Sequence, residues 1–394
     1  MNLQLLTPEI QQFINDHLKD NPTKLLLKHK EVFGVPFTEI IEQIQAKTRC
    51  EKKLPTWFNA ENIYYPNKLN IEQTSSEKTA NYKAKLLSGN SLIDLTGGFG
   101  VDCYAFSKQF QQVTHCEISP KLSEIVTHNY NSLQVENIQT VNQDGIAYLQ
   151  NSSKTYDCIY IDPSRRNDVK GKVFLLEDCL PDVVSHQELL FAHADTILIK
   201  TSPLLDITNG LRALQHVKEV HVVAVQNEVK ELLWLLDKNT NTENVSIKTV
   251  NLTNKEDEFF NFQLSAEKEF TVVYNHPKKY LYEPNAAIMK AGGFSSIAKT
   301  FQLEKLAQHS HLYTSNQLIS FPGRRFEVQK ILPYTKKIIK KELNLPKANI
   351  TTRNFPESVS NIRKKLTIAD GGEDFLFLTT VFTGKKAVIH CVKA

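Results

Sequence analysis

The 394-residue chain contains no apolar run of the ~18–20 residues that a transmembrane helix requires. Its first residues, Met1-Asn2-Leu3-Gln4, lack the basic and apolar regions of a secretion signal. The six cysteines form no CxxC pair, so neither a zinc site nor a redox motif is indicated, and no metal is expected. These absences predict a cytoplasmic protein without a membrane partner, whose cysteines are reduced and mostly buried.

The length of the chain and its ordinary composition, with 41% hydrophobic and 23% charged residues, predict a globular protein of two or three domains. The net charge of +4 is unevenly distributed. From residue 271 onward, 20 Lys and Arg stand against 8 Asp and Glu, a net charge of +12 that leaves −8 for the rest. A basic C-terminal third favours a nucleic-acid partner, and a merely solvated basic surface is the alternative.

Three regions differ in their pattern. Residues 1–86 are predicted to be helical, residues 87–268 alternate strands with helices, and residues 269–394 suggest a small α+β domain. The middle region predicts a Rossmann-like, doubly wound α/β sheet, in which ligands bind beyond the C-terminal ends of the strands. Its strands are expected at residues 91–95, 113–118, 138–141, 156–161, 196–200, 220–225 and 259–264. A helix is expected at residues 229–236, and a strand at 270–274.

A glycine-rich run, Asp94-Leu95-Thr96-Gly97-Gly98-Phe99-Gly100, follows the first of these strands and precedes a predicted helix. Glycines allow the backbone to approach a ligand closely, and the helix N-terminus offers free N–H groups. Glu117 closes the second strand 23 residues after Asp94, near the ~20-residue spacing of an acid that binds ribose hydroxyls. Asp144 follows the third strand, where an adenine amine could donate to it.

These residues resemble the donor-binding motifs of class I S-adenosylmethionine-dependent methyltransferases. In that pattern an acid begins a loop with three alternate glycines, and here Thr96 stands at the first glycine position. The resemblance implies S-adenosylmethionine as cofactor, bound by Asp94, Thr96, Gly98, Gly100, Glu117, Ile118 and Asp144. NAD binding is a rival, since its sites also use a ribose-binding acid. As structural alternatives, Asp94 would stabilise the loop, Glu117 would be solvated, and Asp144 would form a turn before Gly145.

A second motif, Asp162-Pro163-Ser164-Arg165-Arg166, follows the fourth strand. It resembles the Asn/Asp-Pro-Pro-aromatic signature of methyltransferases that act on amino groups. An exocyclic amine is a poor nucleophile because its lone pair is delocalised, and the Asp162 carboxylate and Pro163 carbonyl could align it with a methyl donor. Asp162, Pro163, Ser164 and Arg165 are therefore the candidate catalytic residues. An ordinary turn after the strand is the alternative for Asp162 and Pro163.

This motif departs from the signature at two positions. Ser164 replaces the second proline, and Arg165 replaces the aromatic residue. A guanidinium can stack on a base or bind a phosphate, which favours a nucleic-acid acceptor, although Arg165 and Arg166 could instead pair with acids such as Asp168 or Glu177. Carbon methylation would need a nucleophilic cysteine, and Cys158 inside its strand is a poor candidate. Lys200-Thr201-Ser202-Pro203 could line the acceptor channel or form a turn.

The wider combination of motifs, which includes Glu72-Gln73-Thr74-Ser75-Ser76 and Tyr280-Leu281-Tyr282-Glu283-Pro284-Asn285, resembles a bacterial family of methyltransferases with a C-terminal THUMP-like domain. The resemblance implies an RNA methyltransferase whose last domain captures the substrate, rRNA or tRNA. We expect methylation of an exocyclic base nitrogen, with guanine N2 preferred. A protein or small-molecule methyltransferase, and a non-catalytic donor-binding RNA module, are the alternatives. The sequence does not predict an oligomeric state.

Overall fold

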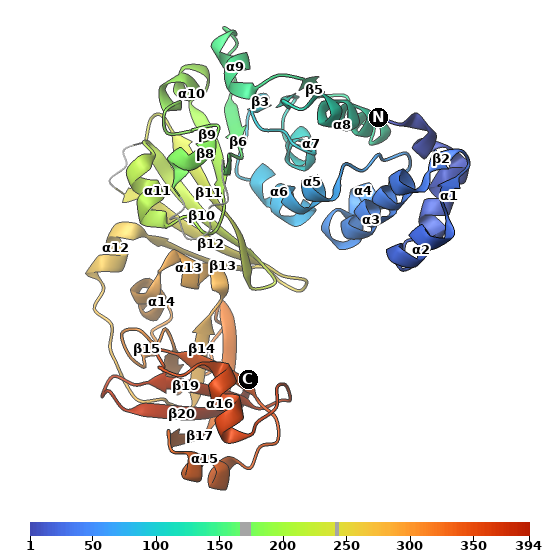
Figure 1. Cartoon of the computed structure of the whole chain (residues 1–394). Helices are drawn as coiled ribbons and strands as arrows, with labels where there is room; N and C mark the ends of the chain where they lie inside the picture. The colour runs from blue at the N-terminus through green and yellow to red at the C-terminus, as the bar shows by residue number, and fades with distance from the viewer. Residues whose placement is uncertain (166–174, 241–243) are drawn as a thin grey trace. The chain divides into compact units, whose positions relative to one another are not determined.

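The computed structural model describes residues 1–165, 175–240 and 244–394 (Figure 1). It divides into two compact units, the first made of Met1–Val217 and Leu233–Asn241, the second of Lys218–Leu232 and Thr242–Ala394. Within the described ranges, no helix combines the length and the apolar character that a membrane span needs.

Helices dominate the start of the first unit, as the sequence predicts (blue in Figure 1). They are α1 (Pro8–Asp16), α2 (Pro22–Lys28), α3 (Phe37–Lys53), α4 (Pro55–Asn59), α5 (Lys68–Gln73) and α6 (Glu77–Ala84), with a short hairpin of β1 (Glu31–Val32) and β2 (Val35–Pro36) before α3. Local signals start them: Asn21 caps α2 by accepting from the N–H groups of Thr23 and Lys24, and Ser76 caps α6. The Asn129 side chain ties the region to the next, because it bonds both the N–H and the C=O of Tyr64 at 2.9 Å.

The predicted parallel sheet follows. Its strands in the first unit are β3 (Ser91–Asp94), β4 (Gln112–Cys116), β5 (Ile138–Val141), β6 (Cys158–Ile161) and β9 (Thr196–Thr201). The helices between and after them are α7 (Val101–Ser107), α8 (Pro120–Ser132), α9 (Gly145–Gln150), α10 (Gln187–His193) and α11 (Ile207–Ala213). β3 pairs in parallel with β4 and β6, β4 with β5, and β6 with β9. The C-terminal ends of parallel strands share one edge of a sheet, so the loops after these strands converge.

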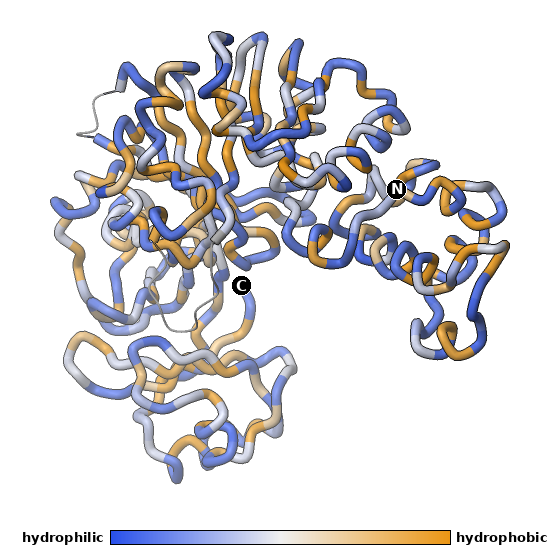
Figure 2. Tube along the Cα trace, turned by 45° about the horizontal axis from the view of Figure 1, so that its top comes forward, coloured by the Kyte–Doolittle hydropathy of each residue, from blue (hydrophilic) through white to orange (hydrophobic). Residues whose placement is uncertain are grey.

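The sheet continues beyond β9 with further strands, β10 (Val217–Val225), β11 (Glu228–Asp237), β12 (Ser246–Leu252) and β13 (Glu258–Gln263). Its full order is β13-β12-β10-β11-β9-β6-β3-β4-β5. The central strand β6 is buried at all four residues, as expected where a parallel sheet is covered on both faces, and Figure 2 shows the hydrophobic stretches of the chain in orange. The predicted doubly wound α/β fold class is confirmed.

The helix predicted at residues 229–236 is wrong, because this segment is strand β11. Gln226 and Asn227 both have positive φ, 51° and 65°, which is the backbone of a tight hairpin turn. Six consecutive residues of β11 are buried, so the apolar run has no alternation to distinguish it from a buried helix. The strand predicted at 270–274 is also wrong: α12 (Leu264–Glu269) precedes it, and only Tyr274 makes an isolated bridge.

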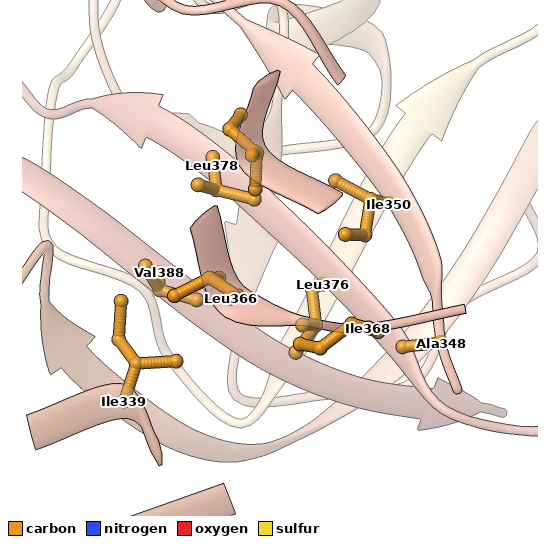
Figure 3. Packing of buried hydrophobic residues seen from close by; sticks show 9 residues of the cluster. Ile339, Ala348, Ile350, Leu366, Ile368, Leu376, Leu378 and Val388 are labelled. Atoms are coloured by element: carbon orange, nitrogen blue, oxygen red, sulfur yellow. The ribbon is translucent and has the colours of Figure 1, made fainter. Parts of the chain in front are cut away.

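The C-terminal part of the second unit is the α+β domain that the sequence predicts. Its strands are β14 (Tyr280–Pro284), β15 (Glu304–Lys305), β16 (Tyr313–Ser315), β17 (Gly323–Pro333), β18 (Asn349–Arg353), β19 (Phe375–Thr380) and β20 (Lys386–Lys393), in the order β15-β16-β14-β17-β20-β19-β18. Its helices are α13 (Ala286–Ala291), α14 (Phe294–Thr300), α15 (Lys336–Leu343) and α16 (Val359–Leu366). One core cluster packs Ile339 of α15 and Leu366 of α16 against the strand residues Leu376, Leu378 and Val388 (Figure 3).

Candidate functional site

The glycine loop after β3 packs closely against neighbouring residues at Gly97 and Gly100, and it has free space beside Gly98. The Gly97 N–H donates to the Cys116 carbonyl at 2.8 Å, and a side chain at Gly97 would collide with the buried His115 ring. Gly100 has a φ of 79°, and its carbonyl accepts from the Tyr130 hydroxyl at 3.0 Å. Gly98 also has positive φ, 56°, but its nearest neighbour in the direction of a side chain is the Thr96 carbonyl, 3.7 Å away. The loop therefore presents free space where a ligand can approach the backbone.

Glu117 joins this loop to the end of β4. Its Oε2 accepts from the Gly98 N–H at 3.0 Å, and its Oε1 accepts from the Ser119 N–H at 2.7 Å. Each carboxylate oxygen has further lone pairs, so both ribose hydroxyls can still donate to Glu117. The neighbouring Ile118 is 68% exposed, an apolar surface suited to an adenine face. Asn142, which the sequence did not single out, orients this turn by donating to the Glu117 carbonyl at 2.8 Å. These groups fit a nucleoside-containing cofactor.

Asp144 lies at the end of β5, beside the same edge of the sheet. Its side chain is exposed, and its Oδ1 accepts from the Ala147 N–H at 2.9 Å, so it caps α9. Gly145 follows because a side chain there would collide with Leu95 of the glycine loop. The observed contact is the turn-forming one that the sequence left as an alternative, and contact with adenine stays a prediction.

Asp94 lies fully buried at the end of β3. Its Oδ1 accepts from the Thr96 N–H at 2.9 Å, and its Oδ2 lies 3.2 Å from Cys103 Sγ. Burial raises the pKa of Asp94 to about 7, with the Asp102 and Asp162 carboxylates adding to the rise and the Thr96 and Cys103 hydrogen bonds opposing it. The contacts of this carboxyl are those of the loop-stabilising alternative, and a contact of Asp94 with the donor stays a prediction.

The raised pKa of Asp94 predicts a pH-dependent stability. The folded state keeps the Asp94 proton up to about pH 7, whereas the unfolded chain releases it near 3.8, so the free energy of unfolding falls as pH rises between these values. Asp94→Asn cannot ionise at this position. As the pH is raised from 4 to 8, we expect its free energy of unfolding to increase relative to that of the wild type by up to about 4 kcal/mol. Urea unfolding at both pH values measures this difference, and parallel stability curves for the two proteins would contradict it.

Asp162 follows β6 and lies beside the glycine loop. Its N–H donates to Thr96 Oγ1 at 2.7 Å, and its carboxylate forms an ion pair with Lys200 of β9. Pro163 is buried, whereas Ser164 is exposed and donates weakly to the Leu180 carbonyl at 3.5 Å. The chain then continues into β7 (Ser164–Arg165), which pairs with β8 (Cys179–Leu180). The glycine loop and the Asp162-Pro163 motif therefore meet at one edge of the sheet, and their roles as donor and acceptor sites stay predictions.

The arginine pair can be described only in part. Arg165 pairs through its backbone with Cys179, while Arg166 and its possible partner Asp168 lie outside the described residues. Cysteine catalysis finds no support in the geometry, since all six cysteines are buried and unpaired with one another. Burial raises the pKa of the Cys158 thiol to about 12, far from that of a nucleophile. Across the described part of the chain, His, Cys, Asp and Glu form no group that could hold a metal ion.

The structure contains a buried charge network around Asp102 that the sequence did not predict. Asp102 of α7 accepts from the Ser75 hydroxyl at 2.8 Å and from the Tyr160 hydroxyl at 2.9 Å, and it pairs with Lys83 at 3.2 Å. Burial alone would raise the pKa of Asp102, but Lys83, Lys200 and the two hydroxyls together hold it below its ordinary value. The network links α6 and α7 to β6. Its only sequence signal was the run of hydroxyl residues at 74–76, which is equally typical of a helix cap.

Comparison with protein families agrees with this geometry. Residues 73–219 match the family described as conserved hypothetical protein 95, residues 280–322 match a ferredoxin-like domain, and residues 323–393 match a THUMP domain-like family. A comparison with curated protein sequences gave no match.

One solved structure is similar over almost the whole chain, and others match a smaller part of it. A candidate methyltransferase from Porphyromonas gingivalis W83 is 34% identical, with a TM-score of 0.88 over 99% of this chain and 98% of that one. An rRNA methylase from Streptococcus thermophilus is 12% identical, with a TM-score of 0.30 over 41% of this chain and 95% of that one. A candidate methyltransferase from Streptococcus mutans, solved with S-adenosylhomocysteine, is 11% identical, with a TM-score of 0.31 over 41% and 96%. The chain belongs to the bacterial family of class I S-adenosylmethionine-dependent methyltransferases that carry a C-terminal THUMP-like domain.

Proposed function

We propose that this methyltransferase acts on an exocyclic base nitrogen in RNA, with guanine N2 as the preferred atom. The observation that carries the proposal is the position of Asp162. Its carboxylate stands at the end of β6, and its N–H is bonded to Thr96 of the donor loop at 2.7 Å. An acceptor held by Asp162 would therefore lie beside a methyl group delivered above Gly98.

The chemistry that this site must supply is orientation. Bound S-adenosylmethionine supplies an electrophilic methyl group. Asp162 and the Pro163 carbonyl would accept hydrogen bonds from the amine, which would turn the nitrogen lone pair toward that methyl. The N–C bond would form as the bond between sulfur and the methyl carbon breaks, leaving S-adenosylhomocysteine, and the nitrogen would then release one proton to water. Gly98, Gly100 and Glu117 hold the donor, with Ile118 and Asp144 at its adenine end. Ser164 and Arg165, next in the chain, would contact the RNA near the acceptor base.

The proposed RNA-binding domain, residues 269–394, carries a basic face that supports an RNA substrate. In α15 (Lys336–Leu343), Ile339 faces the core, and the exposed positions are four lysines, Lys336, Lys337, Lys340 and Lys341, together with Ile338 and Glu342. α16 adds the exposed Lys364, whereas its neighbour Lys365 pairs with Glu357 at 3.2 Å. A cavity of about 470 Å³ between these helices is lined by Ile339, Leu343 and Leu366 beside Lys340. Cations beside apolar surface suit a phosphate backbone with an unstacked base.

Two arginines of this domain, Arg324 of β17 and Arg353 of β18, have a structural role. Arg324 donates to the buried Glu283 at 2.6 Å, and Arg353 donates to the same carboxylate at 2.8 Å. These two arginines therefore contribute less free charge than their number suggests, so the exposed lysines Lys336, Lys337 and Lys341 of α15 are the better candidates for phosphate contacts.

Neutralising this lysine face should weaken RNA binding in a salt-dependent manner. We expect the triple variant Lys336→Ala, Lys337→Ala, Lys341→Ala to lower the slope of log K against log[salt] by about 2 to 3, because three phosphate contacts would be lost. Filter binding of labelled total RNA over a salt series measures the slope. A matched triple alanine variant of the exposed lysines at 19, 24 and 28 in the helical region should keep it. An unchanged slope in the first variant would contradict the assignment.

The proposed function is tested by nucleoside mass spectrometry of RNA from a strain that lacks the gene. We expect one methylated nucleoside, N2-methylguanosine, to be depleted, and purified protein with labelled donor to restore it in that RNA. If a different methylated base were depleted, the proposal of an RNA substrate would stand, but the proposed target atom, guanine N2, would be wrong. We also propose a cytoplasmic location for the reaction.

Two alternatives make different predictions. A protein or small-molecule methyltransferase would keep its activity when residues 271–394 are deleted, whereas an RNA enzyme would lose substrate capture. A non-catalytic module would bind S-adenosylmethionine without consuming it on any RNA class. The basic C-terminal region argues against the first alternative, and the Asp162 geometry argues against the second.

A further inference from the structure

Asp162 is held at two points by residues outside its own motif. Its backbone N–H donates to Thr96 Oγ1 at 2.7 Å. Its carboxylate Oδ2 forms an ion pair with Lys200 Nζ. Thr96 lies in the loop after β3, and Lys200 lies near the end of β9, so the acceptor aspartate is fixed from the strands on both sides of β6. An ordinary turn after a strand needs neither contact.

The Thr96 contact gives a physical reason for the missing glycine in the donor loop. The Thr96 hydroxyl accepts from the Asp162 N–H and lies 3.3 Å from Asp94 Oδ1, to which it can donate. A hydroxyl can donate and accept at the same time, so one side chain connects the end of β3 with the end of β6. A glycine at this position could make neither bond. Thr96 thus links the donor loop directly to the acceptor motif.

The Lys200 contact acts on the carboxylate itself. The Lys200 side chain is only 13% exposed and that of Asp162 is 33% exposed, so the pair is partly shielded from water. Shielding strengthens the attraction relative to a surface ion pair, whose value is small. Lys200 occupies Oδ2 and leaves the lone pairs of Oδ1 for an acceptor amine. The ion pair also fixes the direction in which that oxygen points.

We propose that Thr96 and Lys200 are positioning residues that hold Asp162 in the orientation needed to align the acceptor amine. Thr96 sets the backbone of the motif, and Lys200 sets its carboxylate. The inference rests on the proposed function of Asp162, because positioning matters only if Asp162 contacts the acceptor. It adds to that function two side chains that affect the rate of methyl transfer through Asp162 and need not contact the RNA.

For each residue, a pair of substitutions distinguishes the effect of losing the hydrogen-bonding or charged group from the effect of changing the shape of the side chain. Thr96→Val keeps the shape of threonine and removes the hydroxyl, whereas Thr96→Ser keeps the hydroxyl. Lys200→Met keeps the length of lysine and removes the charge, whereas Lys200→Arg keeps the charge. We expect Thr96→Val and Lys200→Met to lower kcat about 100-fold, as a misplacement of about 1 Å would, and each conservative variant to recover most of the loss.

The kinetic test uses labelled S-adenosylmethionine and RNA from the strain that lacks the gene. In Lys200→Met, kcat should fall while KM for the RNA changes less than threefold and the calorimetric Kd for the donor changes less than twofold. A general structural defect would instead lower Tm, change both constants, and fail to recover in Lys200→Arg. Equal turnover in Lys200→Met and the wild type would overturn the role of Lys200.

A second measurement needs no acceptor. The Asp162 amide is bonded to Thr96, so hydrogen–deuterium exchange of a peptide covering residues 158–165 should be slow at this amide in the wild type and at least tenfold faster in Thr96→Val. Thr96→Ser should restore protection, and Lys200→Met should increase exchange less. Unchanged exchange in Thr96→Val would overturn the inference. If the wild type transfers no methyl group to RNA, the proposed function fails, and the exchange data still decide whether Asp162 is held this way.

Discussion

Asp162→Ala should lower methyl transfer to RNA by about 10³-fold while leaving the binding of S-adenosylmethionine intact. The alanine removes the oxygens that would orient the acceptor amine. The donor groups Gly98, Gly100 and Glu117 lie on β3 and β4 loops that make their own hydrogen bonds. Incorporation of labelled methyl groups measures transfer, and calorimetry measures donor binding in the same preparations.

A graded variant makes this test sharper. Asp162→Asn keeps the size of the side chain and one acceptor oxygen but loses the ion pair with Lys200, so its rate should fall between those of the wild type and Asp162→Ala. Calorimetry on all three proteins provides the control for folding of the donor site. Wild-type turnover in Asp162→Ala would remove Asp162 from the reaction and, with it, the main support for an amino-group acceptor.

Lys83→Met should lower the free energy of unfolding by about 3–5 kcal/mol. Lys83 is completely buried, and its ammonium lies 3.2 Å from Asp102 Oδ1. Removing this cation leaves a carboxylate inside the protein without its principal counter-charge, while Ser75 and Tyr160 supply only hydrogen bonds. Because the network supports α7 directly after the glycine loop, donor affinity should fall as well. Urea unfolding at pH 7 measures the stability change.

Two comparisons isolate the buried charge as the cause. Lys85→Met removes an exposed lysine just after the same helix and should cost less than about 0.5 kcal/mol. In an Asp102→Asn background the carboxylate is already neutral, so Lys83→Met should cost much less than it does in the wild type. Equal losses in both backgrounds would mean that the packing of the lysine chain, not its charge, stabilises this region.

Features that depend on neighbouring residues were predictable from the sequence. The strands that end at Asp94, near Glu117 and before Asp162 are short and rich in apolar or β-branched residues, and the prediction for each lies within two residues of its observed ends. Helix starts at Asn21-Pro22 and Ser76 follow from the capping side chains that the structure shows. The proposed domain boundaries near residues 86 and 268 and the roles of the site residues stay predictions.

Features that depend on burial from both sides were not predictable. β11 is buried over six residues, five of them apolar, and burial of both faces removes the alternation that identifies a strand. Its hairpin turn, Gln226-Asn227, lacks glycine and so gave little warning. The opposite error at residues 270–274 came from an apolar run whose Val273 is 62% exposed.

The sequence by itself determined that a glycine loop, an acid predicted to bind ribose and an aspartate-proline motif stand at the ends of parallel strands, because each is defined by its immediate neighbours. It could not determine which side chains meet across those strands. Only the tertiary structure paired Thr96 with Asp162, Lys200 with Asp162, and Lys83 with Asp102. Such pairs join residues far apart in the chain, and their contact depends on strand register and helix packing, which no local pattern encodes.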